Sequence, residues 1–180
     1  LILKAITYSS FWDIASFIIY GFSLIILYAA STFYHAAKDP KKRRRLNIFD
    51  HAAIYVLIAG SYTPFCLVAL DSELGWYMFI AVWVFALTGI VFKLFFTGKF
   101  DKAFLLFYLC MGWLIILDFN SVVSLIPLNG ILLLVLSGLL YSVGTIFYSL
   151  QNMKYSHAIW HLFVLGGSAS HYFVVLFYVI

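Results

Sequence analysis

Charged side chains are scarce in this sequence: 11 Lys and Arg and 7 Asp and Glu make up only 10% of its residues. A soluble domain carries about a quarter of its residues as charges, so this scarcity excludes an ordinary water-soluble fold. The two cysteines, Cys66 and Cys110, are too few for a disulfide framework, and their apolar surroundings favour buried packing roles. What remains is a chain that is 65% hydrophobic, which predicts a polytopic membrane protein.

Six apolar runs are long enough to cross a bilayer, which takes about 20 helical residues. They cover residues 11–35, 48–70, 75–97, 102–119, 127–150 and 156–180. Strand alternation is absent, so we expect an all-α transmembrane helical bundle that forms a single domain over residues 1–180. Residues 1–4 read like the end of a truncated apolar segment, so we expect the natural N-terminus to lie upstream. Pro64 lies inside the second run and predicts a kink there.

The basic residues fall on alternate connections between these runs. Residues 36–45 carry six, residues 93–102 carry three and the fifth connection carries Lys154. Because Lys and Arg favour the cytoplasmic side, we expect these three connections to be cytoplasmic and both chain ends to point outward. We interpret the run Lys41–Arg45 as a topology determinant that touches anionic lipid headgroups, and not as a nucleic-acid site. The acids expected near the outer side, solvated or interfacial, are Asp13, Asp71, Glu73 and Asp118.

Four histidines and one aspartate share one expected membrane depth, just inside the cytoplasmic ends of the runs. They are His35, Asp50, His51, His157 and His161. Ionisable groups at this depth are costly and mark candidate functional sites. His51 points away from its neighbour Asp50, as adjacent helical residues do, and we interpret it as an interfacial histidine. His171 lies about 15 Å further along the last helix than His161, so we expect it to hydrogen-bond inside the bundle.

The spacing of the histidines predicts a zinc site. His157 and His161 lie on one helical face, about 6 Å apart, and can bind one ion together. With His35 they supply three imidazoles, and three protein ligands plus water form a catalytic zinc site. Asp50 would hold or deprotonate the water, and Ser31 places a hydroxyl one turn deeper on the His35 face. The alternative is that these are interhelical hydrogen-bonding histidines and that Ser31 is a packing residue.

Three motifs together carry a family resemblance. "SSTFYH", "DHAAIYVLIAGSYTPF" and "HAIWHLFVLGGSASHY" resemble the hemolysin III family, the bacterial relatives of the progestin and adiponectin receptors, which belong with the alkaline ceramidases to one superfamily of membrane hydrolases. The resemblance runs over essentially the whole chain. It implies seven spans, the first of them a helix before residue 1 that this chain lacks. It also implies zinc ligands at His35, His157 and His161, a water-contacting aspartate at Asp50 and the motif serine at Ser31.

The resemblance also implies a function and a place in the cell. We expect an integral protein of the bacterial plasma membrane, with zinc near the cytoplasmic face and membrane lipids as partners. The leading hypothesis is a zinc-dependent hydrolase of a lipid amide bond, in which Asp50 accepts the water's proton and Ser31 hydrogen-bonds the oxyanion. A sensor whose helices are clamped by zinc is the alternative. A pore-forming cytolysin ranks third, because the deep polar groups cluster at one end of the helices. The sequence alone leaves open whether the protein is catalytic at all.

Overall fold

The protein is built from membrane-length helices. The computed structural model describes residues 10–70, 72–150 and 152–179, and these residues form helices and no strands. Six helical segments among them are long and apolar enough to cross a membrane, which confirms the all-α prediction and makes the chain an integral membrane protein. These segments are Phe11–Ala36, Pro40–Ala69, Glu73–Phe96, Lys102–Leu125, Leu128–Ser149 and Ser156–Val179. Residues 1–4 and Asp71, discussed above, lie outside the described residues.

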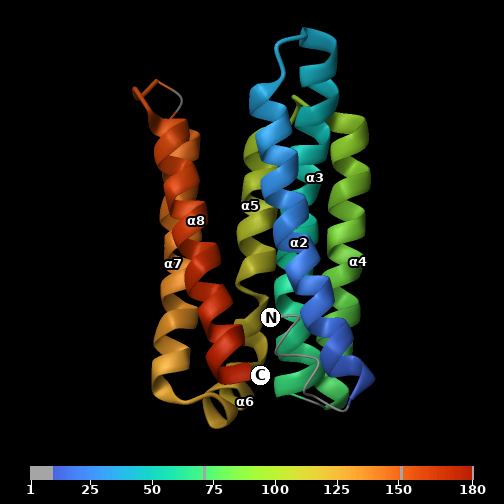
Figure 1. The fold of residues 1–180 in the computed structure, drawn as a ribbon, viewed down its shortest axis with the longest axis vertical. Coiled ribbons are helices and arrows are strands. Elements are labelled where there is room, and N and C mark those ends of the chain that lie inside the picture. Colours follow the sequence, from blue (N-terminus) through green and yellow to red (C-terminus); the bar gives the residue numbers. More distant parts are fainter. Residues whose placement is uncertain (1–9, 71, 151, 180) are drawn as a thin grey trace. The chain divides into compact units, whose positions relative to one another are not determined.

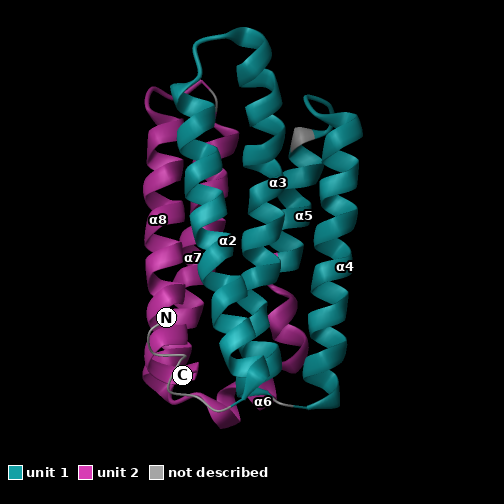
Figure 2. Cartoon of the chain, turned by 45° about the vertical axis from the view of Figure 1, so that its right-hand side comes forward, with its two compact units in different colours: residues 1–111 teal, residues 112–180 magenta. Residues whose placement is uncertain are grey.

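The chain divides into two compact units, Leu1–Met111 and Gly112–Ile180 (Figure 2). The helices of the first unit are α2 (Phe11–Ala36), α3 (Pro40–Pro64), the π-helix η1 (Phe65–Ala69), α4 (Glu73–Phe96) and most of α5 (Asp101–Gly112) (Figure 1). The helices of the second unit are the 3₁₀-helix η2 (Leu114–Asp118), α6 (Phe119–Leu125), α7 (Leu128–Ser149), α8 (Ser156–Val174) and the π-helix η3 (Val175–Val179).

α3 is the central helix of unit 1 and packs against α2 and α4. In its most apolar stretch 61% of the residues are buried, against 28% for α2 and 22% for α4. Each of these helices starts at a side chain that accepts a backbone hydrogen bond: Ser10 for α2, Asp39 for α3 and Ser72 for α4. Such caps satisfy N–H groups that the helix itself leaves without a partner. The outer faces of α2 and α4 remain apolar and exposed, as lipid-facing surfaces require.

α3 begins at Pro40, whereas the sequence prediction places its start at residue 48. The Asp39 carboxylate accepts a hydrogen bond from the Lys42 N–H at 2.7 Å, and proline suits the first helical position because that position needs no N–H donor. The run Lys41–Arg45 therefore lies in the first helical turns and not in a loop. Hydropathy marks only the apolar part of a helix, so it misses turns that continue beyond the apolar part.

Lys93 lies inside α4, so its prediction as a residue of the third connection is wrong. Its side chain is only 1% exposed. Its Nζ lies 4.7 Å from the centroid of the Phe104 ring in α5. An aromatic face attracts a cation and offsets part of its desolvation, which allows a lysine to be buried at the end of an apolar helix.

The helix changes its type where the sequence predicts a kink. α3 ends at Pro64 and continues directly as the π-helix η1. The wider turn is closed by the Leu70 N–H, which donates to the Phe65 carbonyl at 2.9 Å. Cys66, in this turn, is buried as expected, but Cys110 is exposed in α5, so the predicted packing role is wrong for Cys110.

α7 and α8 form the main contact of unit 2 and lie side by side in Figure 1. A glycine of each helix faces aromatic side chains of the other: Gly144 lies against Trp160 and Phe163, and Gly167 lies against Tyr141. Small residues let membrane helices approach closely. Hydrogen bonds cross the same interface, between the Tyr141 and Ser168 hydroxyls at 2.8 Å and between the Ser137 hydroxyl and His171 Nδ1 at 3.5 Å. The hydrogen-bonding role predicted for His171 is thereby confirmed.

Asp118 is buried, so the prediction that it is solvated or interfacial is wrong. Its side chain is 8% exposed at the end of η2. Oδ1 accepts a hydrogen bond from the Ser121 hydroxyl at 2.6 Å, and Oδ2 has no hydrogen-bond partner among the residues that the structure describes. The reason is that helical structure continues through α6 to Leu125, beyond the predicted end at residue 119. Asp13 and Glu73 lie in the first turns of α2 and α4, where an acid is favoured by the helix dipole.

We predict that Gly89→Ala lowers the melting temperature of the protein in detergent. An added Cβ would lie 2.3 Å from Cε1 of Tyr55, a fully buried ring that also packs against Tyr108. The ring has little space to move, and overpacking of this kind costs about 2 kcal/mol. Gly21→Ala is the matched control in α2, because no described residue outside the backbone of α2 itself lies within 4 Å of its added Cβ. Equal melting temperatures for the two variants would contradict this account.

Candidate metal centre

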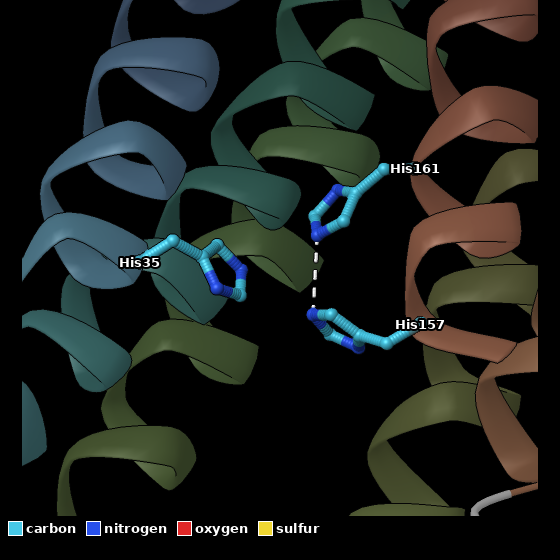
Figure 3. A group of neighbouring side chains, drawn as sticks. All are labelled: His35, His157 and His161. Carbon is cyan, nitrogen blue, oxygen red and sulfur yellow. Dashed lines mark hydrogen bonds between the residues drawn. The ribbon is translucent and has the colours of Figure 1, made fainter. Parts of the chain in front are cut away.

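Two histidines of α8 in unit 2 face each other. The Nε2 atoms of His157 and His161 lie 3.1 Å apart, as the dashed line in Figure 3 shows. One ring donates an N–H and the other accepts it. His157 is exposed and His161 is half-buried. The spacing argument correctly placed both rings on one helical face.

The geometry of this pair fits a metal such as zinc. Zinc binds an imidazole nitrogen at about 2.0 to 2.1 Å, which puts two nitrogens of a tetrahedral site about 3.3 Å apart. The 3.1 Å separation of the two Nε2 atoms is close to that value. The pair would hold one ion once both rings turn their Nε2 lone pairs toward it in place of the shared hydrogen.

The turn before α8 and the facing helix α7 hold the histidine pair in position. α8 begins after Tyr155, whose backbone has a φ of 64° in the left-handed region that L-residues rarely adopt. The Tyr148 ring of α7 lies 6.1 Å from the His157 ring and 5.5 Å from the Trp160 ring. Sequence reasoning missed Tyr148, because nothing in the sequence separates it from the many other aromatics near helix ends.

In unit 1, the structure brings Ser31 and Asp50 together. Ser31 and His35 lie one turn apart near the end of α2, and the Ser31 side chain forms a hydrogen bond with Asp50 of α3. The His35 ring is exposed and packs 4.7 Å from the Tyr34 ring, centroid to centroid. A carboxylate, a hydroxyl and an imidazole from two packed helices thus belong to one region of unit 1.

His51 takes part in a different set of contacts. Its Nε2 lies 3.5 Å from the amide nitrogen of Asn47, one turn earlier in α3. Its backbone carbonyl accepts a hydrogen bond from the Tyr108 hydroxyl of α5 at 3.1 Å. The first contact lies within α3 and the second connects α3 to α5, so we assign His51 a structural role.

The candidate ligands are divided between the units. Unit 1 contributes His35 and unit 2 contributes His157 and His161, and each offers one ring nitrogen (Figure 3). Three such nitrogens are enough to hold a metal ion, and neutral imidazole is a preferred ligand of zinc. The chemistry of this donor set therefore fits zinc.

Comparisons with known proteins cover almost the whole chain. A family model described as "Haemolysin-III related" matches residues 1–172. The chain is 50% identical to a hemolysin-3 homolog of Bacillus subtilis (strain 168), over 99% of this chain and 84% of that protein. It is 46% identical to hemolysin-3 of Bacillus cereus, over 100% and 82%. It is 31% identical to the human monocyte to macrophage differentiation factor, over 91% and 70%. No solved structure matches the chain.

Proposed function

The chain belongs to the haemolysin-III-related family, and we propose that it is a zinc-dependent hydrolase that cleaves an amide bond of a membrane lipid. His35, His157 and His161 hold the ion in this proposal. The observation that carries it is the pair of Nε2 atoms that converge within 3.1 Å on one face of α8. A zinc ion at this place would polarise the substrate's amide carbonyl and would lower the pKa of a water molecule bound to it.

Asp50 is the general base of the proposed reaction. Its carboxylate accepts a proton from the attacking water and passes a proton to the nitrogen of the departing amine. The Ser31 hydroxyl, which pairs with Asp50 in the resting protein, orients this carboxylate. Once Asp50 has taken up a proton, it no longer needs the Ser31 donor, and the hydroxyl is free to hydrogen-bond the oxyanion that develops on the substrate.

The position of these residues along the helices suits a lipid substrate. His35 lies in the last turn of α2 and His157 lies in the first turn of α8, both near helix ends. An amide close to a lipid headgroup would lie at this depth, and its acyl chain would extend along the apolar helices. We place this end at the cytoplasmic face of a bacterial plasma membrane. The basic residues just before α3 and in its first turns favour that side, and two of the similar proteins are from Bacillus.

Release of fatty acid from lipids tests the proposal. The purified protein is incubated with N-acylated lipids and, as a comparison, with ester lipids, each with and without a metal chelator, and the products are measured by mass spectrometry. We expect fatty acid to be released from an N-acylated lipid and the release to stop when the metal is removed. Bound zinc without release from any lipid class would overturn the hydrolase proposal and favour the sensor that zinc clamps.

A further inference from the structure

Residues 38–45 concentrate positive charge at the start of α3. The segment contains six basic residues and a single acid, Asp39, and all of these side chains are exposed. Cations are unfavourable at a helix N-terminus, where the helix dipole is positive, and Lys41 and Arg45 also repel each other one turn apart. An anionic partner at this end of the helix would remove both costs.

Arg43 contacts an aromatic ring of the preceding helix. Its guanidinium carbon lies 5.4 Å from the centroid of the Tyr34 ring in α2. That ring in turn lies 4.7 Å from the ring of His35. A cation over an aromatic face is held in place, and a guanidinium still presents its N–H fork to a planar anion when it is stacked. Tyr34 therefore keeps Arg43 next to one of the proposed zinc ligands, within unit 1.

We propose that Arg43 recognises the phosphate of the lipid substrate, so that the substrate is an anionic, phosphate-bearing lipid. This inference rests on the hydrolase function proposed above. The guanidinium fork binds phosphate oxygens through two parallel hydrogen bonds, which gives the headgroup a fixed orientation. Arg43 and His35 both lie against the Tyr34 ring, so a bound substrate would have its phosphate at Arg43 and its amide a few bonds away at the metal. Neutral lipids lack the group that this arginine would bind.

Equilibrium binding of a fluorescent phosphatidic acid in neutral detergent tests this inference. Phosphatidic acid carries the phosphate but no amide bond, so it reports binding of the headgroup without turnover by the proposed reaction. We expect Arg43→Gln to weaken binding about tenfold, the usual effect of losing a hydrogen bond to a charged group. Arg43→Lys should restore part of the affinity, because a lysine keeps the charge but lacks the fork. Arg45→Gln is the matched control, since it removes the same charge two residues away, and should change the affinity less than twofold.

Competition experiments distinguish the possible sources of the phosphate. Unlabelled phosphatidic acid should displace the probe, whereas diacylglycerol and glycerol 3-phosphate should not. Equal displacement by diacylglycerol would overturn the role of the phosphate. Equal displacement by glycerol 3-phosphate would show that the acyl chains are not needed, and would overturn the proposal that the ligand is a lipid. Equal losses in the Arg43→Gln and Arg45→Gln variants would show only nonspecific attraction by the basic segment and would also overturn the inference.

The role of Arg43 and the hydrolase function can be tested independently of each other. Binding that depends on Arg43, in a protein that releases no fatty acid, would support headgroup recognition and would overturn the hydrolase function. Zinc-dependent release that is equal for neutral and phosphate-bearing lipids, and unchanged by Arg43→Gln, would support the hydrolase and overturn the role of Arg43.

Discussion

A protein with both His157→Ala and His161→Ala should lose its bound zinc, from about one ion per chain to less than about a tenth of that. The two Nε2 atoms are 3.1 Å apart and supply two of the three proposed ligands. His35 alone would bind zinc too weakly to survive purification. Metal content is measured by plasma mass spectrometry on protein purified in detergent, with zinc present during expression.

His171→Ala is the control for this experiment. His171 lies in the same helix, but its ring contacts the Ser137 hydroxyl, so this variant should keep its zinc. Circular dichroism and gel filtration check that each variant is folded. A folded double variant that retains zinc, or an unaltered protein that never contains it, would refute the metal centre.

Asp50→Asn should reduce lipid hydrolysis about a thousandfold while the zinc content stays unchanged. The amide has nearly the same shape as the carboxylate but cannot accept the water's proton at neutral pH. Ser31→Ala should have a smaller effect, about tenfold, because the serine acts on the orientation of Asp50 and on the oxyanion through one hydrogen bond. The rate of fatty-acid release per bound zinc is the quantity compared.

Asp13→Asn provides the matched control for Asp50→Asn. Asp13 lies in the first turn of α2, far along that helix from His35, so the same chemical change there should leave hydrolysis intact. If Asp50→Asn removed the zinc, Asp50 would be a ligand or a support of the ligands. If it left the rate unchanged, Asp50 would not be the base.

The sequence predicts the helices well, because a membrane span needs a long apolar run and that run is visible directly. It does not predict where a helix continues beyond the apolar stretch. The first turns of α3, from Pro40, are polar and look like a loop, yet Asp39 caps them as a helix. Hydropathy also misses the end of the fourth span, because α6 continues that span beyond Asp118.

Lys93 shows the second limit of sequence reasoning. A hydropathy pattern assigns a lysine near the end of an apolar run to the surface, because burial of a lone cation is costly. Whether the cost is offset depends on a partner from another helix, here the ring of Phe104. Contacts between helices are not encoded in the spacing of residues along one helix.

In the candidate site, too, the sequence predicted a relation within one helix but not the contacts between helices. The face shared by His157 and His161 follows from their spacing, because both lie on one helix. The hydrogen bond between Ser31 and Asp50 joins two helices, and the sequence assigned the serine either to the oxyanion or to packing. The contact between Arg43 and Tyr34 also joins two helices, so the sequence showed this arginine only as one of six similar charges.

The π-helix after Pro64 has a consequence for insertions and deletions in this span. A π-helical turn takes in more residues than an α-helical turn, so η1 can be derived from an α-helix by inserting a single residue. Removing one residue from Phe65–Ala69 would restore an α turn, and α3 before it and Leu70 after it would keep their positions. A relative with a one-residue gap here would therefore retain the same helix packing, whereas a gap near Asp50 would rotate that carboxylate away from Ser31.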